Sequence, residues 1–184
     1  MKRVLVFVLG IFFTVQALQA QSKFFTKSAK IQFFSKAPLE DIEAKTKTAT
    51  CVLDTDAGTI QFSLLVKSFE FENELMQEHF NDDYLESHKF PKSEFKGQII
   101  NHTAVNFKKA GIYPVQVRGK LTIHGETKEI ETNGTIAVNG DNIAVKASFP
   151  VTLADYKIRI PSLVKDKISK TVLITVDGKL EPLK

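Results

Sequence analysis

The sequence has no tryptophan, only three tyrosines and a single cysteine among its 184 residues. Because an internal disulfide requires two cysteines, the fold depends on its packed core. Cys51 lies in the strand-like run Thr50-Cys51-Val52-Leu53, where a small buried apolar residue is the simpler interpretation. A reactive thiol is the alternative, although no basic residue stands close in sequence to activate it.

Concentrated positive charge is also missing. No run of five or more Lys and Arg residues occurs, and acidic residues are interleaved with basic ones throughout the chain. The formal net charge of +4 falls to +2 once Lys2 and Arg3 are removed with the N-terminal segment described below. Nucleic-acid binding is therefore not expected.

Sequence signatures of catalysis and of metal binding are lacking as well. The four histidines, His79, His88, His102 and His124, form no His-x-His or His-x₃-His pair, so we expect no metal site. His124, just before Gly125, is interpreted as a turn residue that tolerates a left-handed backbone. No Gly-x-Ser-x-Gly motif is present. We expect no catalytic residues, no cofactor and no enzyme; a hydrolase or redox protein that uses Cys51 or the histidines is the weaker alternative.

A long apolar run occurs at the N-terminus. Lys2-Arg3 precedes the nearly unbroken apolar residues 4–13, and Ala17-Leu18-Gln19-Ala20 offers small residues for cleavage. This pattern predicts a signal peptide over residues 1–20 and a periplasmic or secreted protein with no transmembrane segment after cleavage. A retained membrane anchor is the alternative, but about 15 apolar residues are fewer than the ~20 that span a bilayer.

Residues 21–184 are dominated by short stretches in which apolar and polar residues alternate. Turn signals such as Asn139-Gly140 and Asp177-Gly178 separate several of these stretches. The spacing predicts a single all-β domain, an antiparallel up-and-down barrel of about eight strands that leaves no exposed edge. A two-layer sandwich is the competing architecture.

Residues 73–87 interrupt the strand pattern and predict a short helical insert that covers one end of the barrel. Asn73 can cap its first turn, and Met76 and Phe80 share one face because they are four residues apart. Asp82 is expected to cap a second turn that directs Leu85 inward. Before the insert, near Lys67, the apolar positions change from even to odd numbers, which predicts a β-bulge.

Phenylalanine is the abundant aromatic residue, with 15 copies. An eight-stranded barrel either fills its interior with side chains or leaves room for one small apolar ligand. Phe rings within strands suit both outcomes, so the composition leaves both open. Gly97 and Gly119 lie between apolar residues at inward positions of their strands, where we expect the interior to be widest.

A characteristic order of parts runs from residue 68 to residue 128. A strand that ends near Ser68-Phe69 is followed by the helical insert, by Phe90-Pro91 and by a strand that opens at Phe95. The hairpin segment that follows contains the most specific piece, Leu121-Thr122-Ile123-His124-Gly125-Glu126-Thr127-Lys128. This order resembles the YceI-like family of bacteria, which are polyisoprenoid-binding, lipocalin-like proteins, and the resemblance covers residues 28–181.

The resemblance implies a lipocalin-like barrel and an exported protein that sequesters an isoprenoid or similar amphiphilic lipid in its apolar interior. Some family members pair as homodimers, which this sequence neither supports nor opposes. The alternative is a structural or stress-related exported barrel with a filled core and no ligand. With the strand parity, the resemblance predicts that the tunnel for the lipid is lined by Phe62, Leu64, Phe69, Phe95, Ile99, Val117, Leu121 and Phe149.

Overall fold

The computed structural model describes residues 22–183. The predicted signal peptide, residues 1–20, lies outside the described residues. Within residues 22–183, none of the helices has the length and hydrophobicity needed to span a bilayer.

Long antiparallel strands make up most of the described chain, with short helical turns between them. The strands are β1 (Lys23–Lys36), β2 (Asp41–Asp54), β3 (Thr59–Leu65), β4 (Glu70–Phe71), β5 (Lys92–Ile99), β6 (Gly111–Ile123), β7 (Glu126–Asn139), β8 (Asn142–Thr152) and β9 (Thr171–Pro182). The helical elements are η1 (Val66–Ser68), α1 (Glu74–His79), η2 (Phe80–Tyr84), η3 (His102–Ala104), η4 (Leu153–Tyr156) and η5 (Ser162–Val164).

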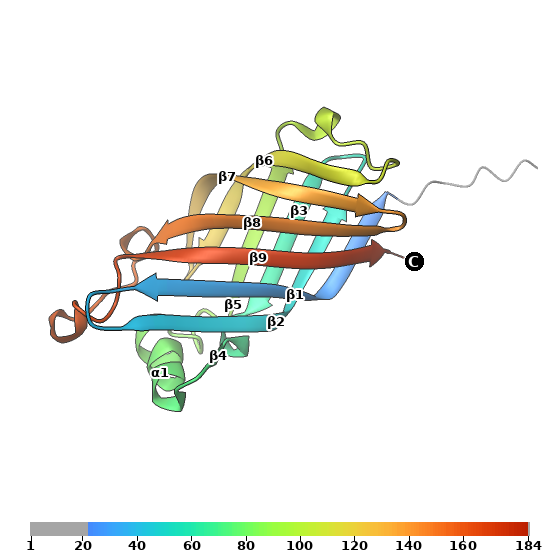
Figure 1. Ribbon diagram of the computed structural model, residues 1–184. Coiled ribbons are helices and arrows are strands. Elements are labelled where there is room, and N and C mark those ends of the chain that lie inside the picture. Colours follow the sequence, from blue (N-terminus) through green and yellow to red (C-terminus); the bar gives the residue numbers. More distant parts are fainter. Residues whose placement is uncertain (1–21, 184) are drawn as a thin grey trace, which may run out of the picture.

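Eight of the strands close into a barrel (Figure 1). The strands follow the order β1-β9-β8-β7-β6-β5-β3-β2, and β1 pairs with β2 to complete the circle. Every neighbouring pair is antiparallel, as in an up-and-down meander. The two-residue strand β4 lies outside this circle and pairs with one end of β2. The predicted all-β, up-and-down barrel of eight strands is therefore confirmed. The alternative, a two-layer sandwich, is wrong.

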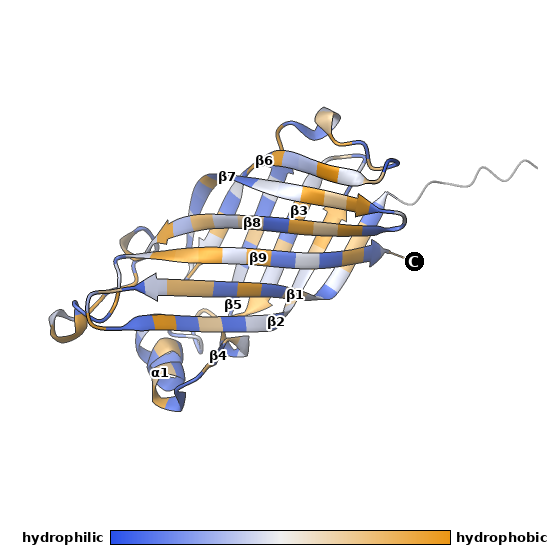
Figure 2. Ribbon diagram, viewed as in Figure 1, coloured by the Kyte–Doolittle hydropathy of each residue, from blue (hydrophilic) through white to orange (hydrophobic). Residues whose placement is uncertain are grey.

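The alternating hydropathy of the strands explains why the sheet closes on itself. Along β3, Ile60 and Leu64 are buried inside the barrel while Gln61 between them is exposed. The same two-residue alternation of apolar and polar positions is visible along the strands in Figure 2. Because successive side chains point to opposite faces, each strand contributes one apolar row to the interior.

The helical insert covers one end of the barrel, as predicted, but its second half differs from the prediction. The side chain of Asn73 caps α1 by accepting a hydrogen bond from the Met76 amide at 3.2 Å. The helix then widens directly into the π-helical turn η2, so the predicted second cap at Asp82 is wrong. Leu85 follows and is buried, as expected.

The change of parity near Lys67 has a different cause from the one predicted. It arises from the 3₁₀ turn η1, which ends β3, and not from a β-bulge. The prediction of a bulge was wrong because a change of parity reveals only that a strand is interrupted and not how. After the turn, Phe69 again points into the barrel and is buried.

The opposite end of the barrel is closed by the segment between β5 and β6. Nε2 of His102 lies 2.6 Å from the carbonyl oxygen of Thr55, to which it donates a hydrogen bond. Gly58 has a φ of +66°, and a Cβ atom there would lie 2.7 Å from the His102 ring, so no larger residue fits. Val105 of the same segment is buried against the core. The segment between β5 and β6 therefore covers the end of the barrel opposite α1.

Candidate functional site

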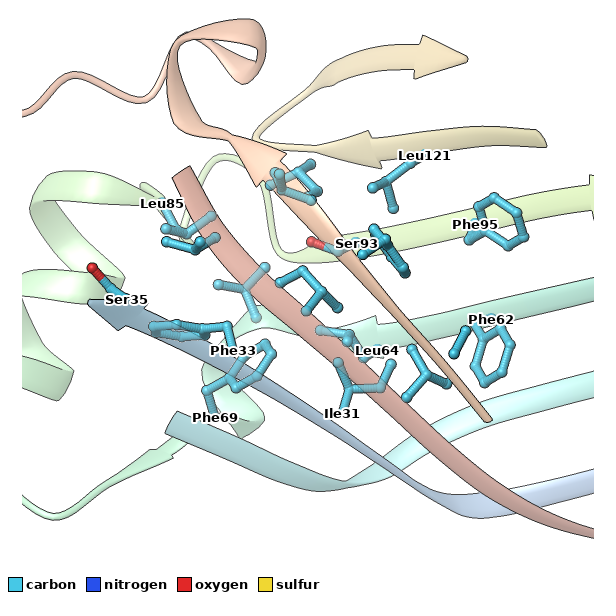
Figure 3. Close-up of a pocket in the computed structure, with 18 of the residues that line it drawn as sticks. Ile31, Phe33, Ser35, Phe62, Leu64, Phe69, Leu85, Ser93, Phe95 and Leu121 are labelled. Atoms are coloured by element: carbon cyan, nitrogen blue, oxygen red, sulfur yellow. The ribbon is translucent and has the colours of Figure 1, made fainter. Parts of the chain in front are cut away.

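The barrel encloses a cavity of about 560 Å³. It is lined mainly by inward-facing aliphatic and aromatic side chains from the strands, several of which converge on a common space in Figure 3. Its volume lies within the range of about 300–1,000 Å³ that is usual for ligand sites. The barrel interior is thus only partly filled by its own side chains.

All eight residues that were predicted from the sequence to line an apolar tunnel line this cavity. Ile99, Val117 and Leu121 are buried, and Phe62, Phe95 and Phe149 are partly buried around the same space. Their contact with a lipid stays a prediction. The eight residues are Phe62, Leu64, Phe69, Phe95, Ile99, Val117, Leu121 and Phe149.

Sequence reasoning missed several lining residues on other strands. Val145, Ala147, Val176 and Ile174 also line the cavity, and the alternation in β8 and β9 could have identified them. Phe33 lines it as well, whereas the adjacent Phe34 does not. Two successive phenylalanines do not show which of them faces the interior of the barrel. The sequence therefore had no signal that distinguished Phe33 from Phe34.

The two glycines expected at the widest part of the interior have another role. Gly97 and Gly119 face each other across β5 and β6, and neither lines the cavity. A Cβ atom would lie 2.5 Å from the Phe95 ring at Gly97 and 2.8 Å from it at Gly119. The prediction is therefore wrong: the glycines make room for the Phe95 ring, which covers them.

Four phenylalanine rings attach the helical insert to the barrel. Phe80 of η2 stacks on Phe33 with ring centroids 5.4 Å apart, and it contacts Phe69 and Phe71 at 5.6 and 5.0 Å. Phe33 also meets Phe69 and Phe71 edge-on. Offset and edge-on pairs of this kind contribute about 0.5–1.5 kcal/mol each beyond their burial. The cluster fixes the insert beside the cavity.

The cavity opens at the end that carries α1. Asn73, Leu75 and His79 line it from α1 and its cap, and their side chains are exposed. Glu40 of the β1–β2 hairpin and Lys167 of the 161–170 loop line the same end. We call this opening the mouth. Polar, charged and apolar side chains thus border the mouth, while the depth of the cavity presents hydrocarbon.

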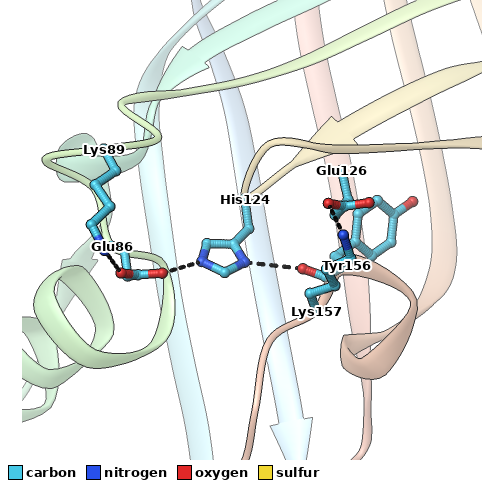
Figure 4. A network of polar contacts seen from close by, with 6 residues as sticks. All are labelled: Glu86, Lys89, His124, Glu126, Tyr156 and Lys157. Atoms are coloured by element: carbon cyan, nitrogen blue, oxygen red, sulfur yellow. Dashed lines mark hydrogen bonds and ion pairs between the residues drawn. The ribbon is translucent and has the colours of Figure 1, made fainter.

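A polar network on one side of this end holds three separate loops together (Figure 4). Nε2 of His124 lies 3.0 Å from a carboxylate oxygen of Glu86, and Nδ1 lies 3.0 Å from the carbonyl oxygen of Tyr156. Both partners are acceptors, so both ring nitrogens can donate only when the imidazole is protonated. Lys89 pairs with the same Glu86, and Lys157 pairs with Glu126 at 2.7 Å. We call this network the clamp.

The backbone of the clamp is held in a conformation that few residues adopt. Glu86, His124 and Lys157 have φ values of 42°, 50° and 56°, which confirms the left-handed turn expected at His124. Such residues persist where their surroundings determine them. Because Leu85 lines the cavity and precedes Glu86, the clamp fixes part of the cavity wall.

Two titratable groups with shifted pKa values, Glu86 in the clamp and Cys51 in the barrel wall, have structural surroundings. The pKa of Glu86 is lowered most by its hydrogen bond from Lys89 and next by that from His124. The carboxylate thus connects two side chains of the clamp. Cys51 is fully buried in the wall, and burial raises the pKa of its thiol to about 12. Residues 22–183 contain no group of three His, Cys, Asp or Glu side chains placed to hold a metal ion. The arrangement is suited to enclosing an apolar molecule.

Comparisons with known proteins agree with this description. The family model described as the YceI-like domain matches residues 13–180. No curated protein matches the chain.

Several solved structures share the fold at low sequence identity. A polyisoprenoid-binding domain from Saccharophagus degradans, implicated in plant cell wall breakdown, has a TM-score of 0.77 at 16% identity and covers 89% of this chain and 100% of its own. BcnA from Burkholderia cenocepacia has a TM-score of 0.67 at 21% identity and covers 83% of this chain and 95% of its own. A YceI protein from Campylobacter jejuni has a TM-score of 0.56 at 14% identity, covering 100% of both chains. With the family match over most of its length, this chain belongs to the YceI-like family.

Proposed function

We propose that the protein binds an isoprenoid or similar amphiphilic lipid, with the tail in the cavity and the head group at the mouth. The observation that carries the proposal is the apolar cavity of about 560 Å³, which residues at the end that carries α1 also line. Each buried CH₂ group contributes about 0.8 kcal/mol, so a hydrocarbon tail needs few polar contacts to bind. The name of the Saccharophagus degradans domain supports an isoprenoid as the ligand class.

The proposal includes export of the protein to the periplasm or the medium. The positively charged and apolar N-terminal residues of the sequence support it. Sequestration, without a chemical step, is the mechanism that the hydrocarbon lining favours. The filled barrel without a ligand is disfavoured by the size of the cavity.

Filling part of the cavity should weaken binding. Ala147 of β8 lines the cavity between Gly134 and Val176, so Ala147→Phe places a ring inside it without burying a charge. We expect affinity for a soluble dansyl-labelled farnesyl probe to fall about ten-fold or more, the effect of losing about two buried methylene groups. Fluorescence titration of the purified protein measures it.

Ala144→Phe is the matched control. Ala144 lies on the same strand with the opposite parity, between the buried Ile143 and Val145, so its side chain points outward. This variant should bind the probe as the parent does. Equal affinities for both variants, with circular dichroism showing both folded, would place the probe outside the cavity and contradict the proposal.

A further inference from the structure

Exposed leucines gather beside the mouth of the cavity. Leu163 at the tip of η5 is 95% exposed, and Leu39 in the β1–β2 hairpin is 72% exposed. Val164, the last residue of η5, and Ile168, four residues later, line the cavity itself. The side of the mouth formed by residues 36–40 and 159–170 therefore presents apolar groups to solvent at the place where an apolar ligand would enter. We call these two segments the lip.

The two segments of the lip are joined to each other directly and through Ser35 of β1. The Leu39 amide donates to the carbonyl oxygen of Asp166 at 3.1 Å, and the Ser169 amide donates to Oγ of Ser35 at 3.0 Å. Within the loop, the Lys167 amide donates to the carbonyl oxygen of Val164 at 2.9 Å. Leu39 and Leu163 are thus carried on one connected surface.

The lip is also positively charged. It contains five basic residues, Lys36, Arg159, Lys165, Lys167 and Lys170, and two acidic ones, Glu40 and Asp166. Four of the basic side chains have no ion pair within residues 22–183, while Lys167 lies 4.0 Å from Glu40. Exposed leucines surrounded by lysines are suited to the interface of a bilayer that contains anionic lipids.

We propose that the lip docks onto an anionic lipid bilayer, with Leu163 and Leu39 inserted among the head groups and the mouth facing the membrane. This inference rests on the proposed function and deepens it, because it states where the lipid is collected or delivered. An apolar tail then passes between bilayer and cavity without crossing water. The chemistry that recognises the lip is the negatively charged membrane surface.

The charge of the helical insert, which also borders the mouth, sets the orientation. The insert carries Glu74, Glu78, Asp82 and Asp83, all exposed. An anionic surface attracts the lip and repels the insert, so the barrel tilts with α1 facing the solvent. This division of charge also makes the docking weak in high salt, because screening removes the attraction.

Vesicle flotation tests the proposal, with the protein purified from the cells that produce it. The protein is mixed with vesicles of phosphatidylglycerol and phosphatidylcholine, or of phosphatidylcholine alone. We expect binding to the anionic vesicles only, and its release by salt. The double variant Lys165→Gln with Lys170→Gln should lower the partition coefficient onto anionic vesicles roughly 25-fold. Each basic residue near an anionic surface raises this coefficient about five-fold. Leu39→Ser with Leu163→Ser should lower it at least about ten-fold.

Matched variants at the closed end of the barrel serve as controls. Ile112→Ser removes an apolar side chain that is 75% exposed where β6 begins, and Lys108→Gln with Lys109→Gln removes two exposed lysines beside it. These variants should float like the parent. Absence of vesicle binding by the parent, or equal losses in lip and control variants, would overturn the docking surface.

Binding of the soluble farnesyl probe separates this inference from the proposed function. The lip variants should bind the probe like the parent, because the cavity is unchanged. Vesicle binding that depends on the lip in a protein that does not bind the probe would uphold docking and refute lipid carriage. Probe binding without vesicle binding would refute docking alone.

Discussion

At the scale of single residues, Cys51, His102 and His124 have structural roles. The Cys51 thiol is fully buried in the wall of the barrel, where it packs with Ala49 and Leu53. His102 closes one end of the barrel by bonding to Thr55, and His124 belongs to the clamp. What the residues offer to a ligand is an apolar surface.

Burial makes Cys51 resistant to alkylation in the folded protein. Its pKa of about 12 leaves very little thiolate at neutral or mildly basic pH, and the thiolate is the nucleophile. We expect iodoacetamide to modify Cys51 slowly in buffer and rapidly in urea, as measured by intact mass. Fast, stoichiometric labelling of the native protein would contradict the assignment and revive a redox role.

Residue positions were predictable where alternation was long and unbroken. Phe62, Leu64 and Phe149 came from such stretches, because a period of two specifies the inward face once one side of a strand is known to be buried. Phe33 could not be separated from Phe34 in this way. The register of β1, which pairs Phe33 with Ile174 of β9 and with the buried Ala44 of β2, identifies the ring that faces inward.

At the scale of elements, the segment between β4 and β5 determines how the mouth is built. Its start was predictable, because Asn73 carries a local capping signal. Its end was not, since the π-helical turn η2 is fixed by packing of Phe80 against three rings from other elements. Local sequence cannot report such long-range contacts. The clamp then holds the end of this segment against the β6–β7 turn and η4.

The contribution of the clamp should depend on pH through Glu86. Because its pKa is lowered in the folded state by Lys89 and His124, ionised Glu86 stabilises the fold above the ordinary carboxyl range. That contribution is lost as the pH falls through the lowered folded pKa. We expect Glu86→Gln to unfold at lower urea concentration than the parent near neutral pH, with the difference disappearing in acid.

Urea unfolding at a series of pH values measures this difference. Glu43→Gln, on the outer face of β2 where the side chain is exposed, is the comparison and should differ little from the parent at any pH. A gap between Glu86→Gln and the parent that persists unchanged into acid would show that the carboxylate charge does not hold the clamp.

At the scale of the whole molecule, closure of the sheet creates the site. Because β1 pairs with both β9 and β2, inward rows from all eight strands face one another around a common space. The sequence predicted this closure but could not decide whether the space was filled. That depends on the sum of side-chain volumes and on where Phe95 and the four-ring cluster settle, which only the assembled barrel determines.

Native mass spectrometry of the protein purified from its own cell envelope, followed by organic extraction, tests the central claim most directly. The account predicts a bound species that dissociates on denaturation and extracts as an isoprenoid or similar amphiphilic lipid. A mass that corresponds to the protein alone, unchanged after incubation with prenyl lipids, would contradict it.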